Sequence, residues 1–254
     1  MHPHERISHA ITDGRDTHGV ALVAYVTAGF PSMDAFAGIL NDACEHADVV
    51  EVGIPFSNPI ADGGTLQETS RVALEHGATM PAIMDSLRDL RGSLGTPLLL
   101  MGYLNPLLAY GLEQLASDAE DAGVCGVIVP DLPPESLDMA QPLTKAGLAT
   151  IGMVSPVTSD ERLNSIVSHT TGFVYAVASV GVTGQHRSDQ RDITGYLERV
   201  RAASPIPVCA GFGIREKAHV DALRGSCDGV IVGSALMEAV REGRSVGEVL
   251  RPLR

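Results

Sequence analysis

The sequence predicts an α/β fold of the (β/α)8 TIM-barrel type, with one extra helix at the N-terminus. Eight short apolar runs alternate with segments of helical period along the 254 residues. The runs are apolar without interruption, as is typical of parallel strands that are buried on both faces. Eight strand–helix units in about 250 residues match the size of such a barrel. A doubly wound sheet is the alternative architecture.

Strands and helices follow one another in order along the chain. The predicted strands are residues 21–28, 48–53, 97–103, 126–131, 150–154, 173–178, 207–211 and 229–233. Helical period is found between them at residues 32–45, 111–122, 134–145, 159–168, 192–203 and 215–223. We expect residues 5–12 to form the extra helix and to close the bottom of the barrel. Because no linker or change of composition divides the chain, residues 1–254 are predicted to be a single domain.

Composition and charge exclude several classes of function. The net charge of −13 argues against nucleic acid and anionic membranes as partners. No apolar stretch is long enough to span a bilayer, and the first residues lack the apolar core of a signal peptide. The four cysteines form no C-x-x-C pair, and the histidines lack the spacing of a metal site. We therefore expect a cytoplasmic protein with reduced thiols and no metal site.

Two carboxylates, Glu51 and Asp62, are the residues that most strongly indicate a functional site in this sequence. Glu51 lies at the end of the second apolar run, and Asp62 lies in the loop after it, which is broken by proline and glycine. A carboxylate on a buried strand is costly to desolvate, and the active sites of such barrels lie at the C-terminal ends of the strands. Two acids in different surroundings can take different protonation roles. The alternative is a strand-end charge that faces water and a helix cap or turn residue.

Glycines follow the last three predicted strands. They are found in residues 181–184, in residues 211–213 and at Gly233, which precedes Ser234 and the expected start of a helix. Glycine lets backbone N–H groups approach an anion closely, and a helix N-terminus adds a favourable dipole. The loops after strands seven and eight are a frequent phosphate site in these barrels. The pattern therefore predicts a phosphate-binding end of the site.

Several short motifs follow one another along the chain, and their combination and order are specific. They are YVTAGFP at 25–31, EVGIPFS at 51–57, ADG at 61–63, LMGYLNP at 100–106, PDLP at 130–133, GVTG at 181–184, GFGI at 211–214 and GSA at 233–235. Through them the chain resembles the tryptophan synthase α subunit family along nearly its whole length. The resemblance implies retro-aldol cleavage of indole-3-glycerol phosphate to indole and glyceraldehyde 3-phosphate, without a metal or an organic cofactor. It also implies a pyridoxal-phosphate β subunit as partner, in an α2β2 heterotetramer.

The resemblance also assigns roles to individual residues. Glu51 matches the family's catalytic glutamate, which moves protons at indole C3 and at the glycerol hydroxyl. Asp62 matches the aspartate that accepts a hydrogen bond from the indole N–H. Tyr175 matches an active-site tyrosine beside the substrate, although a core aromatic is an equally good interpretation of this position.

Further positions match the phosphate cradle, the lid and the indole slot of the family. The residues matching the phosphate cradle are Gly184, Phe212, Gly213, Gly233 and Ser234. Thr183 matches a loop threonine that contacts Asp62 when the lid closes. The apolar slot for indole is expected from the strand positions Leu22, Leu100, Ile128, Val154 and Ile231, each of which could instead be plain barrel core.

The chain departs from the family pattern at three positions. Asn58 replaces the usual aspartate of the loop that meets the β subunit, Gly64 replaces a proline after Asp62, and Leu22 stands where some members carry phenylalanine. The first change puts coupling to a partner in doubt, and the second should make the Asp62 loop more flexible. Two alternatives therefore stay open, a stand-alone lyase that releases indole and a weakly catalytic subunit that activates a partner. A more distant one is another phosphate-binding barrel, such as a phosphoribosyl isomerase.

Overall fold

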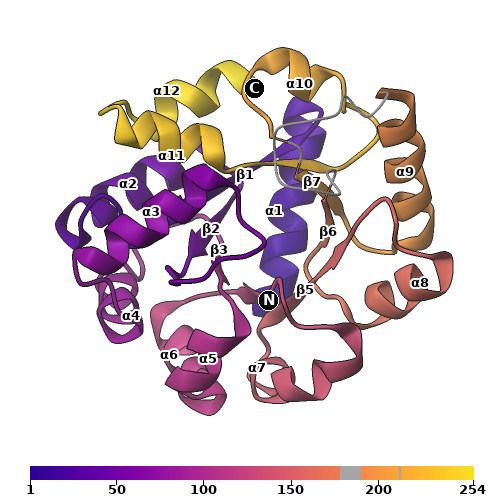
Figure 1. Ribbon diagram of the computed structural model, residues 1–254. Helices are drawn as coiled ribbons and strands as arrows, with labels where there is room; N and C mark the ends of the chain where they lie inside the picture. Colours follow the sequence, from indigo (N-terminus) through magenta and orange to yellow (C-terminus); the bar gives the residue numbers. More distant parts are fainter. Residues whose placement is uncertain (178–189, 212) are drawn as a thin grey trace.

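The computed structural model describes residues 1–177, 190–211 and 213–254, and its centre is a closed barrel of eight parallel strands (Figure 1). The strands are β1 (Ala21–Thr27), β2 (Val49–Gly53), β3 (Leu98–Met101), β4 (Gly126–Ile128), β5 (Ala149–Val154), β6 (Val174–Val177), β7 (Val208–Gly211) and β8 (Gly229–Val232). Each strand pairs with the next, and β8 closes on β1. All eight predicted strands are confirmed, and the closed order excludes the doubly wound alternative.

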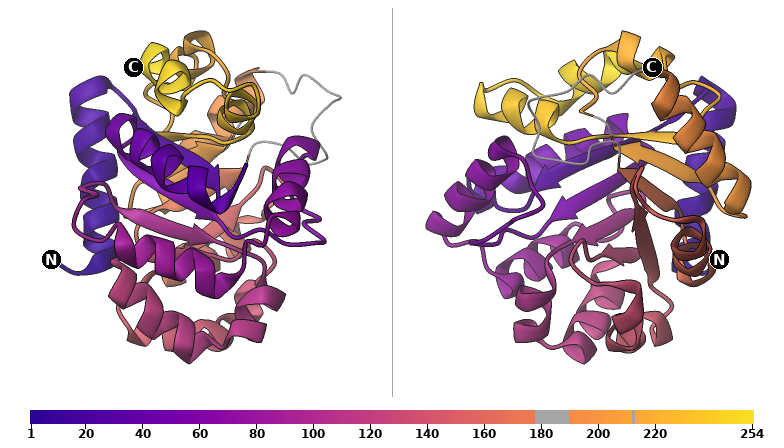
Figure 2. Two further views of the ribbon diagram at one scale, coloured as in Figure 1. Left: turned by 90° about the vertical axis from the view of Figure 1, so that its left-hand side faces the viewer. Right: turned by 45° about the vertical axis from the view of Figure 1, so that its right-hand side comes forward.

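Helices surround the barrel and cover the outer faces of its strands (Figures 1 and 2). They are α1 (Pro3–His18), α2 (Met33–His46), α3 (Gly64–Glu75), α4 (Met80–Asp89), α5 (Leu104–Tyr110), α6 (Leu112–Ala122), η1 (Pro134–Ala140), α7 (Gln141–Lys145), α8 (Asp160–His169), α9 (Gln190–Ala203), α10 (Lys217–Asp221), α11 (Ser234–Arg241), α12 (Val246–Leu250) and η2 (Arg251–Leu253). Hydroxyl side chains accept a backbone N–H at the start of α2, α4, α8 and α12, which satisfies donors that a helix leaves free. Among the described helices, none is long and apolar enough to cross a membrane.

Proline and glycine account for the main differences from the predicted elements. β4 ends at Ile128, ahead of the expected residue 131, and Pro130 has no N–H for a sheet ladder. The expected helix at 134–145 is divided into the 3-10 helix η1 and the short α7, with non-helical dihedral angles at Ser136. The helical pattern did not indicate α3, α4 or α5. Each carries glycine or proline in its first turn, and these residues mark turns in a sequence.

Buried side chains form two layers, one inside the barrel and one between the barrel and the helices. Successive residues of a strand point to opposite faces, so Val23 and Val49 belong to the inner layer while Leu22 and Val50 pack toward the helices. The register pairs Tyr25 with Glu51 across β1 and β2, which places these two side chains at one level of the interior. Alternation and register together decide which side chains reach the open end of the barrel.

Helix α1 closes the end of the barrel that is opposite to the C-terminal ends of the strands (Figure 2). Ile7 and Ile11 are fully buried and belong to the inner layer. Two polar contacts fix the helix, a hydrogen bond from Ser8 Oγ to the carbonyl of Gly172 at 2.6 Å and an ion pair of Arg15 with Asp228 at 2.9 Å. The predicted extra helix is therefore confirmed, and it is longer than expected at both ends.

We expect Ile11→Ala to destabilise the protein by about 2–5 kcal/mol, because it opens a cavity at the closed end of the barrel. The measurement is the free energy of unfolding in urea. His9→Ala, at an exposed position of the same helix, is the matched control and should change stability by less than about 0.5 kcal/mol. Equal effects of the two substitutions would show that α1 does not seal the interior.

Candidate active site

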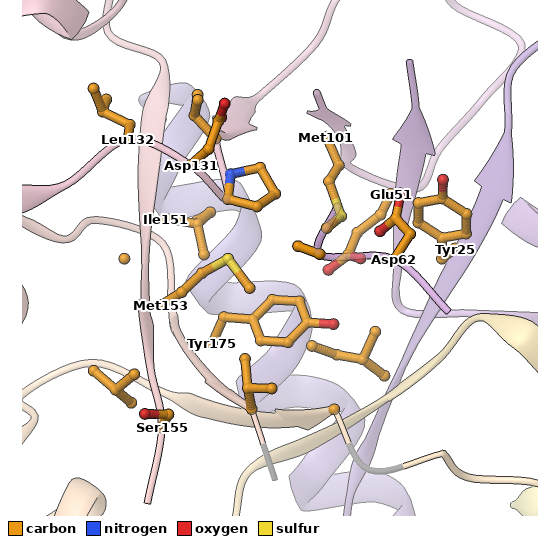
Figure 3. A pocket seen from close by; sticks show the side chains of 18 of the residues that line it. Tyr25, Glu51, Asp62, Met101, Asp131, Leu132, Ile151, Met153, Ser155 and Tyr175 are labelled. Atoms are coloured by element: carbon orange, nitrogen blue, oxygen red, sulfur yellow. The ribbon is translucent and has the colours of Figure 1, made fainter. Parts of the chain in front are cut away.

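A cavity of about 1050 Å³ opens at the C-terminal ends of the strands. Figure 3 shows the carboxyl groups of Glu51 and Asp62 and the hydroxyl of Tyr175 directed toward a shared space. The cavity also reaches Gly213 and Ser234. The fold thus brings together residues that are far apart in the sequence and that were predicted to belong to one site.

Glu51 is the most unusual group of this cavity. Its side chain is fully buried, and neither carboxyl oxygen has a hydrogen-bond partner in the described part of the chain. Burial disfavours the charged form and raises the pKa of Glu51 to about 8. At neutral pH Glu51 is therefore mostly protonated and can donate a proton, and a smaller fraction is present as the carboxylate that can accept one.

Asp62 lies at the same end of the barrel in more polar surroundings. Burial raises its pKa to about 6, while a hydrogen bond from Tyr103 opposes this rise. Asp62 is therefore mostly charged at a pH at which Glu51 is mostly protonated. One group can act as an acid while the other stabilises positive charge, which is the division expected of two catalytic carboxyl groups.

Tyr103 holds the segment that carries Asp62, and this role was not predicted from the sequence. Its hydroxyl oxygen accepts the backbone N–H of Ala61 at 2.9 Å, and it is hydrogen-bonded to the Asp62 carboxyl group. The ring is buried and lies against Phe56, with 5.4 Å between the ring centroids. Tyr103 follows β3 directly within the motif LMGYLNP. Its position directly after a strand could have marked Tyr103 as a candidate site residue. Its contact with Asp62, 41 residues earlier, could not be predicted from the sequence.

Two tyrosines enclose the carboxyl groups, and glycines on neighbouring strands make room for them. A Cβ at Gly53 would lie 2.0 Å from the Tyr25 hydroxyl oxygen, and one at Gly211 would lie 2.7 Å from the Tyr175 ring. Burial raises the pKa of both phenols, so they stay neutral. Tyr175 lines the cavity as predicted from the resemblance, whereas Tyr25 was not singled out.

Three of the five positions expected in the apolar slot are not among the described residues that line the cavity. Leu22 and Leu100 are fully buried in the layer between barrel and helices, and neither is among the described residues that line the cavity. Tyr25, three residues after Leu22, and Met101, directly after Leu100, point to the opposite face of the sheet and line the cavity instead. Continuous apolar strands hide this alternation because both faces are buried.

The other predicted slot positions have different outcomes. Ile231 lines the cavity from the inner layer, together with Ile151 and Met153. Val154 also lines it, but like Leu22 and Leu100 it belongs to the layer between barrel and helices. Ile128 belongs to the inner layer of the barrel and is not among the described lining residues. The apolar part of the described wall also contains two thioether side chains, those of Met101 and Met153.

Gly213, Gly233 and Ser234 line the cavity on the side of β7 and β8. Gly213 has a left-handed φ of 63°, which favours glycine, and Ser234 is the first residue of α11. Backbone N–H groups and the positive end of a helix dipole at this place can hold an anion. The predicted residues Thr183, Gly184 and Phe212 lie outside the described residues.

No group of three or more His, Cys, Asp or Glu side chains that could hold a metal ion is found in residues 1–177, 190–211 and 213–254. The four cysteines are free thiols, and three of them are buried.

A family model described as the tryptophan synthase alpha chain matches residues 12–250. The alpha chain from Phenylobacterium zucineum is 43% identical over 231 residues, which cover 90% of this chain and 83% of the relative. That from Bacillus cereus is 41% identical over 236 residues and covers 92% and 90%. The structure of tryptophan synthase subunit alpha from Legionella pneumophila superposes with a TM-score of 0.88 at 32% identity, covering 100% and 97% of the two chains. A chain of Mycobacterium tuberculosis tryptophan synthase gives 0.88 at 32% identity, with 98% of each chain covered.

The buried Glu51 should leave a signature in the pH dependence of stability. Its pKa rises from an ordinary 4.5 to about 8 on folding, so the folded state holds the extra proton between these values. Stability therefore falls as pH rises through this window, by up to about 1.4 kcal/mol per pH unit. Glu51→Gln lacks this loss, and its free energy of unfolding relative to wild type should rise steadily from pH 5 to pH 8. Parallel pH dependence of the two proteins would contradict the raised pKa.

Proposed function

The chain belongs to the tryptophan synthase alpha chain family, and we propose that it carries out the family's reaction with Glu51 and Asp62 as its two catalytic acids. The reaction is a carbon–carbon lyase step of tryptophan biosynthesis. It cleaves indole-3-glycerol phosphate to indole and glyceraldehyde 3-phosphate. The observation that carries the assignment is the Glu51 carboxyl group, which is buried, unpartnered within the described residues and directed into the cavity.

Glu51 can supply both proton transfers of the cleavage. A neutral Glu51 first donates its proton to indole C3, which leaves a cationic ring and a carboxylate. The carboxylate then takes the proton of the adjacent glycerol hydroxyl while the bond between C3 and the glycerol carbon breaks. The bonding electrons return to the ring, the hydroxyl carbon becomes the aldehyde, and Glu51 regains its proton. A pKa of about 8 suits a group that must act in both directions near neutral pH.

Asp62 acts on the ring nitrogen. Because its pKa is only about 6, it is charged at neutral pH and can accept a hydrogen bond from the indole N–H. Positive charge develops on the ring when C3 is protonated. A carboxylate that is already in position stabilises this charge without any reorganisation of the site. Tyr175, Met101, Val154 and Ile231 form the apolar surroundings that we assign to the indole ring. These residues and Glu51 supply the chemistry without a metal or an organic cofactor.

The phosphate end of the substrate is assigned to Gly213, Gly233 and Ser234, with Gly184 and Phe212 as further positions from the resemblance. A phosphate here would receive backbone N–H groups and face the N-terminus of α11. We assign the glycerol part of the substrate to the part of the cavity between this end and Glu51. Thr183 is assigned to a lid that contacts Asp62.

A β subunit is proposed as partner, in an α2β2 heterotetramer. Exposed apolar side chains project from segments that follow four neighbouring strands, namely Ile60 after β2, Leu108 after β3, Met139 after β4 and Val157 after β5. Ile60 and Val157 are 74% and 73% exposed. Apolar groups that gather around the mouth of a cavity favour a docking surface over a stand-alone lyase. We place the chain in the cytoplasm, where a biosynthetic enzyme of this family works.

Indole release from indole-3-glycerol phosphate, with and without a β subunit, tests the function. We expect the wild type to release indole and Glu51→Gln to lower kcat by about 10²–10⁴-fold, because the amide keeps the shape and loses the proton chemistry. Circular dichroism and the urea midpoint check that the variant folds. Most of the activity surviving in Glu51→Gln would reject the assignment, and no release by the wild type under either condition would reject the function.

Coupling to the partner should be weak in this chain. Asn58 is exposed in the loop after β2, and Gly64 is the first residue of α3 with open space beyond its Cβ position. Gly63 is extended, with φ −74° and ψ 163°, so proline fits at position 64 as the first helical residue. We expect Asn58→Asp and Gly64→Pro to raise the ratio of indole release with and without a saturating β subunit, within about five- to 150-fold. An unchanged ratio in both variants would show that neither residue limits coupling.

A further inference from the structure

Glu238 on α11 joins two segments of the active site that the chain does not connect directly. Its Oε1 accepts a hydrogen bond from Thr65 Oγ1 at 3.0 Å. The same carboxylate accepts two hydrogen bonds from Arg215, one from Nη2 to Oε1 at 3.0 Å and one from Nη1 to Oε2. We call these three side chains the brace.

Each member of the brace lies close to a group that was assigned to substrate. Thr65 is the second residue of α3, three residues after Asp62. Arg215 follows Gly213 by two residues and itself lines the cavity. Glu238 lies four residues after Ser234, one turn further along α11. The brace therefore runs from the phosphate end of the site to the segment that carries Asp62.

The position of Asp62 depends on α3. Gln67 of this helix donates a hydrogen bond from Nε2 to the backbone carbonyl of Asp62 at 2.8 Å. Helix α3 in turn packs against α11 and is bonded to it through Thr65. A shift of α11 or of the loop after β7 would thus be passed through α3 to the backbone of Asp62.

Stability is a poor explanation for this arrangement. The side chains of Arg215 and Glu238 are 54% and 23% exposed, and ion pairs at such positions contribute little to folding. A carboxylate shared by two donors, one on α3 and one in the loop after β7, instead fixes their relative positions. The bidentate contact also fixes the orientation of the Arg215 guanidinium at the wall of the cavity.

We propose that Glu238 is a positioning residue that couples binding of the substrate's phosphate to the placement of Asp62. The proposal rests on the proposed function, because it takes Asp62 as the group that binds the indole N–H. Phosphate bound near Gly213 and Ser234 would order Arg215 and α11, and the brace would then hold α3 and Asp62 in the conformation that accepts indole. The two halves of the substrate would therefore bind cooperatively.

Binding of the two substrate fragments tests this coupling. The dissociation constant of indole is measured by calorimetry with and without saturating glycerol 3-phosphate, and its ratio is the coupling factor. We expect the wild-type factor to be about fivefold or more, and to fall toward one in Glu238→Ala and in Thr65→Val. The double variant should be no worse than Glu238→Ala, because both substitutions break one connection.

A matched control lies on the same helix end. Glu242, the residue after the last turn of α11, pairs with Arg244 and is not among the described residues that line the cavity, so Glu242→Gln should keep the wild-type coupling factor. The urea midpoint is followed for every variant. A changed midpoint with an unchanged coupling factor would mean that the brace is only structural and would overturn the proposal, as would a wild-type factor of one.

Turnover separates this proposal from the proposed function. If the wild type cleaves indole-3-glycerol phosphate but Glu238→Ala keeps both kcat and the coupling factor, the brace is rejected and the function stands. If the wild type cleaves no substrate, the function fails whatever the fragments do. The expected result is a fall in kcat of about 10-fold in Glu238→Ala, because a misplaced Asp62 stabilises the cationic ring less well.

Discussion

The burial of Glu51 without a partner is the constraint on which the rest of the site depends. β2 is hydrogen-bonded to β1 on one side and to β3 on the other, so the strand cannot rotate and release the side chain to solvent. The carboxyl group lowers the cost of burial by keeping its proton, which is what moves its pKa to about 8. Its reactivity is thus a consequence of the closed parallel barrel, and no neighbouring base or metal is needed to produce it.

The closed barrel can accept this cost because the remainder of its interior is well packed. Ile7 and Ile11 of α1 fill the end that would otherwise admit water below Glu51. Beside it, Tyr25 and Tyr175 occupy the space that Gly53 and Gly211 leave free. Water is excluded from below and aromatic rings stand at the sides, so the carboxyl group is accessible only from the cavity. Packing at the bottom of the barrel therefore sets the chemistry at the top.

Features that depend on local sequence pattern, such as the strands, could be predicted from the sequence. Features that depend on the direction of a side chain, or on contacts between distant segments, could not. Eight apolar runs predicted eight strands, and the acid in the second run predicted Glu51 as a site residue. Leu22 and Leu100 were assigned to the wrong face, because runs that are buried on both sides show no alternation. Tyr103 was missed for another reason: its contact with Ala61 is a pairing of two loops that only the closed barrel brings together.

Asp62 shows how the position of a carboxyl group in the cavity can be set by neighbouring segments instead of by its own segment. The chain around it is intrinsically loose, since Gly63 and Gly64 follow directly and a side chain at Gly64 would meet nothing within 4 Å. Three contacts from elsewhere compensate: Tyr103 holds Ala61, Gln67 holds the Asp62 carbonyl, and Glu238 holds Thr65. The contacts of Tyr103 and Glu238 come from distant parts of the chain, from the segment after β3 and from α11. A proline at position 64 would order this segment from within, so glycine at this position leaves that task to side chains of α3, of α11 and of the segment after β3.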